Sequence, residues 1–329
     1  MNWTMLYDIV YALAARDGRD KALFGTCAPM AHEAFTHSMA GNAFPELWFE
    51  LPLLGDPWFD LHCLTARKDL DPSMTFDAST TGGYPEVFAW FANQGASVRQ
   101  LALSYDVSKG VVDHPAVQLL IADTNFAVTD GFLQVAGRPD AVEAYQTFVK
   151  RLPKGWYPCY TGVFPGRLGE RIRVECIPNS AQQRAYATDP DLFGRDLRQT
   201  GYTGPVDTLV PRCQAMADTP FQFELQFDVT LDGAAGGTIS ASLRFDCPPG
   251  SEEWRAFEPD GAAGELMHKV EGWGLADDRW RLLADTAFAK RASFMGESVL
   301  GYCFPAFVKL KWRDGEPLDA KTYLMAGVE

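Results

Sequence analysis

The chain has 329 residues, of which 47% are hydrophobic and 13% aromatic, so it is long enough to bury a large core. Its net charge of −14 argues against nonspecific binding to nucleic acid or to an anionic membrane, although a local cationic cluster can still hold a small anion. No stretch of the sequence approaches the roughly 18 to 20 apolar residues of a membrane-spanning helix. We therefore expect neither nucleic acid nor a membrane as a partner.

The N-terminal segment carries no basic leader, and Asp8 interrupts its apolar stretch. Residues 3–16 therefore predict an amphipathic helix rather than a signal peptide, and a second helix is expected near residues 29–40. The seven cysteines are scattered singly, in an odd number and without a CxxC pair. Reduced thiols in a cytoplasmic protein are the simplest explanation of this pattern.

Five antiparallel strand pairs follow, each joined by turn-forming residues. They are expected at 46–54 with 58–66, 98–106 with 115–122, 156–164 with 170–177, within 220–247, and within 304–326. In the fourth pair we place Asp232-Gly233 and Gly236-Gly237 in the connection. Helices are expected before and between the pairs, at 85–94, 140–152, 191–199 and 262–292.

The strands are amphipathic with a period of two, as a sheet with one apolar face requires. In the fourth pair, Phe223 and Leu225 alternate with Glu224 and Gln226. Helices interposed between the pairs would cover the apolar faces, which leaves the polar faces to point the other way. An open sheet would expose those faces to solvent, whereas closing ten strands into a barrel removes the sheet edges and turns the polar faces inward.

We therefore predict an α+β fold, a ten-stranded antiparallel β-barrel with helices outside, and one domain over residues 1–329. The alternation predicts that these side chains point inward: Trp48, Glu50, Asp60, His62, Arg173, Glu175, Gln222, Glu224, Gln226, Ser240, Ser242, Arg244, Lys309, Lys321 and Tyr323. It predicts that these side chains pack outward against helices: Phe49, Val174, Phe223, Leu243, Val308 and Leu324. Arginine, lysine and tyrosine donors in a walled cavity suit a diphosphate, and a carboxylate beside them can act as a general base.

Five αββα-like units that build a ten-stranded barrel are the plan of the ABBA prenyltransferases, and the chain resembles that family in the order and number of its elements over nearly its full length. Glu50 resembles the first-strand glutamate that assists deprotonation of the acceptor. Lys321 and Tyr323, in Lys-Thr-Tyr, resemble the Lys-x-Tyr of a diphosphate-binding strand. The second pair departs from the pattern, because it carries no Lys-x-Tyr.

The resemblance implies transfer of a prenyl group from an allylic diphosphate to an aromatic acceptor, either a small molecule or a peptide side chain. The resemblance implies that Glu50 is catalytic. Together with the strand phase, it predicts that the other site residues bind substrate: Arg173, Arg244, Lys309, Lys321, Tyr323, Trp48, His62 and Glu224. No motif implies a cofactor, and Mg²⁺ accompanying the diphosphate stays open. One alternative is a noncatalytic barrel that binds a hydrophobic or peptide ligand in a biosynthetic pathway, and another is a different enzyme on the same scaffold.

Three motifs are set aside. His32-Glu33 and His37 resemble HExxH, but the histidines are one residue too far apart to meet on one helix face. Asp277-Asp278 lacks a third acid and predicts a helix start rather than a magnesium motif. The glycine-rich segment 162–167 has no Walker lysine, so a turn is expected there.

Overall fold

The computed structural model describes these residues of the chain: 16, 19–26, 46–70, 76, 78, 81–107, 111–122, 124–165, 169, 171–245, 253–294 and 297–328. The helices expected at 3–16 and 29–40, and the set-aside histidines at 32 and 37, lie outside these ranges except for residue 16. Within the described ranges, no helix combines the length and the apolar character that a bilayer span needs.

Ten strands form a closed antiparallel barrel, which confirms the predicted architecture. The five predicted pairs are β1 with β2, β3 with β4, β5 with β6, β7 with β8 and β10 with β11, and β11 closes the barrel onto β1. The strands are β1 (Glu46–Pro52), β2 (Asp60–Ala66), β3 (Val98–Asp106), β4 (Val111–Ile121), β5 (Trp156–Val163), β6 (Ile172–Pro178), β7 (Gln222–Val229), β8 (Ala235–Arg244), β10 (Glu297–Arg313) and β11 (Glu316–Val328).

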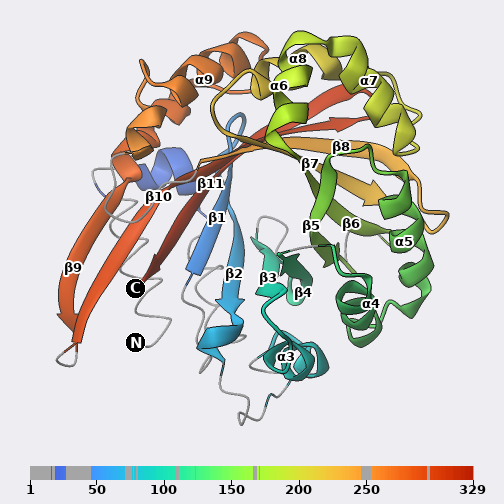
Figure 1. Ribbon diagram of the computed structural model, residues 1–329. Helices are drawn as coiled ribbons and strands as arrows, with labels where there is room; N and C mark the ends of the chain where they lie inside the picture. The colour runs from blue at the N-terminus through green and yellow to red at the C-terminus, as the bar shows by residue number, and fades with distance from the viewer. Residues whose placement is uncertain are drawn as a thin grey trace.

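The helices lie outside the barrel, in an arc that runs from α3 through α9 in Figure 1. They are α3 (Pro85–Ala92), α4 (Phe126–Val135), α5 (Val142–Arg151), α6 (Ser180–Thr188), α7 (Pro190–Gln199), α8 (Leu209–Ala217) and α9 (Ala262–Gly272). Short helical turns are η2 (Asp20–Phe24), η3 (Arg67–Asp69), η5 (Pro139–Ala141), η6 (Glu253–Phe257), η7 (Asp278–Leu282) and η8 (Ala284–Thr286). Asp277 caps η7 and accepts a hydrogen bond from the backbone N–H of Arg279, in agreement with the predicted helix start.

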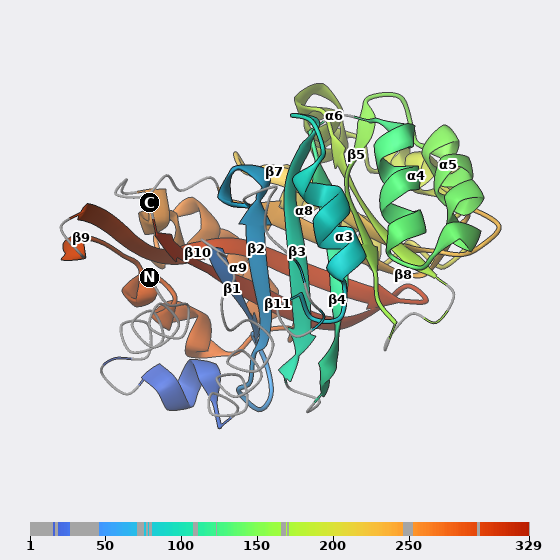
Figure 2. The ribbon, with the colours of Figure 1, turned by 90° about the horizontal axis from the view of Figure 1, so that it is seen from below.

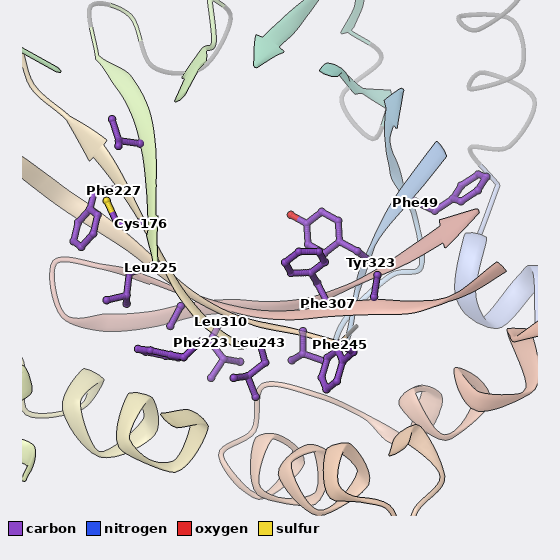
Figure 3. Packing of buried hydrophobic residues seen from close by; sticks show 14 of the residues in the cluster. Phe49, Cys176, Phe223, Leu225, Phe227, Leu243, Phe245, Phe307, Leu310 and Tyr323 are labelled. Carbon is purple, nitrogen blue, oxygen red and sulfur yellow. The ribbon is translucent and has the colours of Figure 1, made fainter. Parts of the chain in front are cut away.

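The core fills the layer between the barrel wall and the helices. Phe227 of β7 lies with its ring centroid 5.4 Å from that of Phe148 on α5, and Phe223 lies 6.1 Å from Phe193 on α7. Figure 3 shows Phe223 and Leu243 directed toward the helices. All six side chains predicted to pack outward are fully buried in this core, so the strand phase inferred from alternation is confirmed.

In the helical region predicted at 262–292, the α-helix ends at Gly272, only the short turns η7 and η8 follow, and the prediction is wrong from Phe288 onward. Gly274 has a φ of 73°, and the N–H of Leu275 bonds back to the carbonyl of Val270, so the chain ends α9 through a left-handed glycine. An eleventh strand, β9 (Phe288–Phe294), then pairs with the first part of β10. Figures 1 and 2 show this hairpin extending beyond the other strands.

Strand β9 forms because β10 begins well before the part of it that pairs with β8. Strand β8 pairs with β10 only from Phe307 onward, so the same edge of β10 is open before that point. Strand β9 takes up this edge as far as Cys303. A second, smaller correction concerns Gly236-Gly237, which belong to β8 and not to the connection that precedes it.

Candidate functional site

A cavity of about 510 Å³ lies inside the barrel, and all ten barrel strands contribute side chains to its lining. All nine side chains predicted to form the site line it: Trp48, Glu50, His62, Arg173, Glu224, Arg244, Lys309, Lys321 and Tyr323. Figure 3 shows Tyr323 and Phe307 on the side of the sheet opposite to Leu243. Of the side chains predicted to point inward, Asp60 is buried but does not line the cavity.

Strand register sets the cavity side chains in rows that cross the barrel wall. One row runs over β11, β10, β8 and β7 through Lys321, Lys309, Ser242 and Glu224. The neighbouring row runs over β1, β11, β10, β8 and β7 through Glu50, Tyr323, Phe307, Arg244 and Gln222. Residues far apart in sequence therefore stand side by side, with the cations of β8, β10 and β11 on one stretch of wall.

Glu50 is the centre of a hydrogen-bonded cluster. Its Oε1 lies 2.5 Å from Nζ of Lys321, and its Oε2 accepts from the Tyr323 hydroxyl at 2.7 Å. Nε2 of His62 lies 3.0 Å from the same Oε2, and Nδ1 of His62 lies 2.6 Å from Oγ of Ser104. Burial acts to raise the pKa of Glu50, but the charge of Lys321, the hydrogen bond of His62 and the charge of Lys309 hold it well below its usual range. Glu50 is therefore ionised at neutral pH.

The pKa values of the donors around Glu50 are shifted in different directions. Burial lowers the pKa of Lys309 to about 8, although the charge of Glu50 opposes this shift. For Lys321 burial acts to lower the pKa, but Glu50 and Asp319 outweigh it and the pKa rises. Burial, and then the charge of Glu50, raise the pKa of Tyr323 well above its usual value. Tyr323 is thus a neutral donor, and its oxygen accepts from Lys309 at 3.1 Å.

Arg173 and Arg244 reach the cavity from different strands of its wall. Nε of Arg173 lies 2.8 Å from Oδ1 of Asp228, and its guanidinium lies 4.5 Å from the ring centroid of Phe164. The guanidinium of Arg244 lies 5.7 Å from the ring centroid of Phe307. Arg173 is therefore paired with an acid of the neighbouring strand.

Aromatic rings stand next to the cations. The ring of Trp48 lies 4.9 Å from that of Phe307 and 6.2 Å from that of Tyr323. The ring centroid of His62 lies 5.6 Å from that of Tyr323. Aromatic faces stabilise a nearby positive charge, so this cluster and the cationic wall offer an apolar and an anion-binding surface side by side.

No model of a protein family matches this sequence, and no curated protein matches it either. Solved structures do match. The crystal structure of the prenyltransferase PriB in its apo form has a TM-score of 0.51 and 12% identity, and the match covers 98% of this chain and 96% of that one. A 6-dimethylallyl tryptophan synthase has a TM-score of 0.52 and 12% identity, with 99% and 96% covered. This chain has the fold of the ABBA prenyltransferases.

The cavity of this ABBA barrel differs in its balance of charged residues from the chain as a whole. Among the described residues that line the cavity, six are lysine or arginine and five are aspartate or glutamate. The whole chain has 29 basic and 43 acidic residues. The cavity lining is thus less acidic than the chain as a whole, and it carries cations that can hold an anionic ligand.

Several residues that line the cavity were not among those predicted to form the site. Lys311 and Phe307 line the cavity on β10, and the alternation that selected Lys309 puts them on the same face. Arg99 and Gln118, on β3 and β4, had no such signal, because the pattern of that pair is the least regular.

The described residues contain no group of three or more His, Cys, Asp or Glu side chains arranged to hold a metal ion. Glu50 and Glu224 are the most buried carboxylates of the cavity. The oxygens of Glu50 already have Lys321, Tyr323 and His62 as hydrogen-bond partners. The described residues therefore offer no cluster of protein ligands for Mg²⁺.

Proposed function

We propose that this barrel transfers a prenyl group from an allylic diphosphate to an aromatic ring of a small molecule or a peptide side chain, with residues 1–329 acting as one domain. The observation that carries the proposal is the juxtaposition in one cavity of Lys309, Lys321 and Arg244 with the rings of Trp48 and Phe307. The names of the two similar structures, a prenyltransferase and a dimethylallyl tryptophan synthase, support the same class of reaction.

In the proposed reaction the bond between the allylic carbon and the diphosphate oxygen breaks, and both electrons leave with the diphosphate. Lys309, Lys321 and Arg244 stabilise the charge that develops on this leaving group. The allylic cation is stabilised by the aromatic faces of Trp48 and Phe307. The surrounding barrel wall limits the access of water to the cation.

The aromatic acceptor then supplies two π electrons for the new carbon–carbon bond, and the positive charge moves to its ring. The ring carbon loses its proton to Glu50 and regains aromaticity. The low pKa of Glu50 suits this role, because a ring carrying a full positive charge is a far stronger acid than a carboxylic acid. Deprotonation therefore needs an ionised carboxylate more than a strong base.

Titration calorimetry with dimethylallyl thiodiphosphate, an unreactive analogue of the donor, tests the first step. Each charge-assisted contact is worth about 1.5–3 kcal/mol, so Arg244→Ala should weaken binding by roughly one to two orders of magnitude. Arg195→Ala is the matched control, because Arg195 is 64% exposed on α7, outside the barrel. If the unmodified protein has no affinity for allylic diphosphates of about five to fifteen carbons, the transferase proposal fails.

A noncatalytic barrel that binds a hydrophobic or peptide ligand is the second candidate. The observation in its favour is that Lys321 and Arg173 already have acidic partners, Glu50 and Asp228, inside the protein. The same titration separates the two candidates, since a binding module of this kind has no need to recognise a diphosphate.

A further inference from the structure

The wall formed by β6 and β7 carries two side chains that the proposed reaction does not use. Glu175 on β6 and Gln226 on β7 are partners in strand register, and both line the cavity. Strand β6 stands five strands from β1 in either direction around the barrel. Glu175 and Gln226 are therefore carried by the wall opposite to the strand of Glu50.

The hydrogen bonds of this pair leave an acceptor unused. Nε2 of Gln226 donates to Oε2 of Glu175 at 2.9 Å, which fixes the orientation of the amide. Oε1 of Gln226 is buried and has no hydrogen-bond partner among the described residues, and the residue as a whole is 8% exposed. Buried acceptors without a partner are costly and rare, so such an atom in a cavity indicates a group that donates to it.

The carboxylate of Glu175 differs from those of Glu50 and Asp228. Glu50 is paired with Lys321 at 2.5 Å and Asp228 with Arg173 at 2.8 Å, whereas Glu175 has no ion pair with any described residue. Arg173 lies two residues away on the same face of β6 but is held by Asp228. Glu175 therefore presents a negative charge to the cavity with only an amide bonded to it.

The surroundings of Glu175 hold charges of both signs, because its charge acts on Lys309 as well as on Cys159. Burial first, and then the charges of Glu175 and Glu224, raise the pKa of the Cys159 thiol well above its usual value, with Arg244 acting weakly in the other direction. Tyr160, the register partner of Glu175 on β5, also lines the cavity and adds an aromatic ring to this wall.

We propose that Glu175 and Gln226 form a second recognition site in the cavity, for a positively charged N–H group such as an amidinium, guanidinium or ammonium. The proposal rests on the proposed function in one respect, because it takes this group to belong to the acceptor substrate. The free oxygens of the two side chains accept from different N–H groups of the cation, and the carboxylate supplies the opposite charge. Tyr160 provides a ring that can cover the cation.

This second site complements the cationic wall. The diphosphate is held by β8, β10 and β11, and the positive group of the acceptor is held by β6 and β7. An acceptor fixed at both its aromatic ring and its cationic end has one orientation relative to the allylic carbon. Glu175 and Gln226 thus determine which acceptors are used and which ring atom reacts.

Matched probes test the site without knowledge of the natural acceptor. Benzamidine and benzamide have nearly the same shape and differ in charge, and tryptamine and tryptophol form a second such pair. In titration calorimetry, the unmodified protein should bind benzamidine about tenfold more tightly than benzamide. Glu175→Gln should remove this preference, and Gln226→Leu should weaken benzamidine binding by about tenfold.

Glu143→Gln, an exposed acid on α5, is the control and should retain the full preference. Melting temperatures of all variants identify any that fail to fold, and Glu175→Gln keeps the shape of the side chain. The proposal is overturned if the unmodified protein shows no preference for the charged probes, or binds none of them at millimolar concentration. It is also overturned if the preference survives in Glu175→Gln, because the cation is then bound elsewhere.

A parallel titration with dimethylallyl thiodiphosphate separates the two proposals. Diphosphate binding without a preference for amidines contradicts the second recognition site and leaves the transferase proposal standing. A preference for amidines that depends on Glu175, without diphosphate binding, contradicts the transferase proposal and leaves a cation-binding barrel.

Discussion

Nζ of Lys321 lies 2.5 Å from Oε1 of Glu50, and the two side chains are only 13% and 6% exposed. The pair joins β11 to β1 at the place where the barrel closes. A buried ion pair contributes little net stability when both partners are present, but removing one partner leaves the other charged and without compensation. The ion pair is therefore part of both the cavity lining and the strand seam that closes the barrel.

Lys321→Met should lower the free energy of unfolding by about 3–5 kcal/mol at neutral pH, because Glu50 keeps its buried charge without the ammonium. The double variant Lys321→Met with Glu50→Gln should recover a large part of this loss. Chemical denaturation of both single variants and of the double variant gives the coupling energy. Additive losses in the double variant would show that the pair is not coupled.

Anion binding should depend on the ionisation of Lys309, whose pKa burial lowers to about 8. Below that pH the ammonium is present, and above it the folded protein loses the proton, so affinity for dimethylallyl thiodiphosphate should fall by up to about tenfold per pH unit. The sign for stability is opposite: between pH 8 and the ordinary lysine pKa the unfolded chain holds more protons, so this group makes folding more favourable as the pH rises.

The control for this pH dependence is Lys309→Met. Ionisation of the ligand itself is common to both proteins, so the difference between their titrations isolates Lys309. Parallel curves for the two proteins from about pH 7 to 9.5 would exclude Lys309 as the titrating group.

Glu50→Gln should separate binding from turnover. The change removes the negative charge beside Lys321, so the affinity for the diphosphate analogue should stay the same or increase by a few-fold. Turnover with an accepted aromatic substrate should fall, because the amide cannot take the proton. Calorimetry and single-turnover kinetics measure the two effects, and a parallel loss of both would indicate a structural role only.

Phe227→Ala tests the outer core that supports the cavity wall. Phe227 is fully buried between Phe148 and Trp156, with ring centroids 5.4 and 6.1 Å away. Its truncation should lower the free energy of unfolding by about 3–5 kcal/mol. Leu231→Ala, at a side chain that is 40% exposed, should change it by less than about 0.5 kcal/mol. Similar losses in both variants would contradict the assignment of Phe227 to the core.

Two predictions from the sequence concern matters that the structure leaves untested. The cytoplasmic location remains a prediction, and the five described cysteines, at positions 63, 159, 176, 213 and 303, are free and buried. The roles of the nine candidate site residues also remain predictions, although their place in the cavity is confirmed.

Alternation along the strands was enough to predict the direction of most of their side chains, although not that of Arg99 and Gln118. Alternation is a local property of an extended chain, so Glu224 and Phe223 take opposite faces whatever the rest of the fold does. The same pattern, repeated in five pairs with helices between them, was sufficient to predict a ten-stranded barrel and the nine residues in its lumen. Local signals failed at 273–294, where the open edge of β10 selected a strand for residues with no strong pattern of their own.

Which groups those side chains contact depends on how distant parts of the chain come together. Glu50 receives its donors from β2 and β11, and Lys321 is 271 residues away from it in sequence. Arg173 is held by Asp228, whereas Glu175 on the same strand has only the amide of Gln226. These partnerships depend on register across the barrel and on its closure, which long-range pairing sets and no local pattern encodes. The pKa shifts of Glu50 and Lys309 follow from the burial and the neighbouring charges that closure creates.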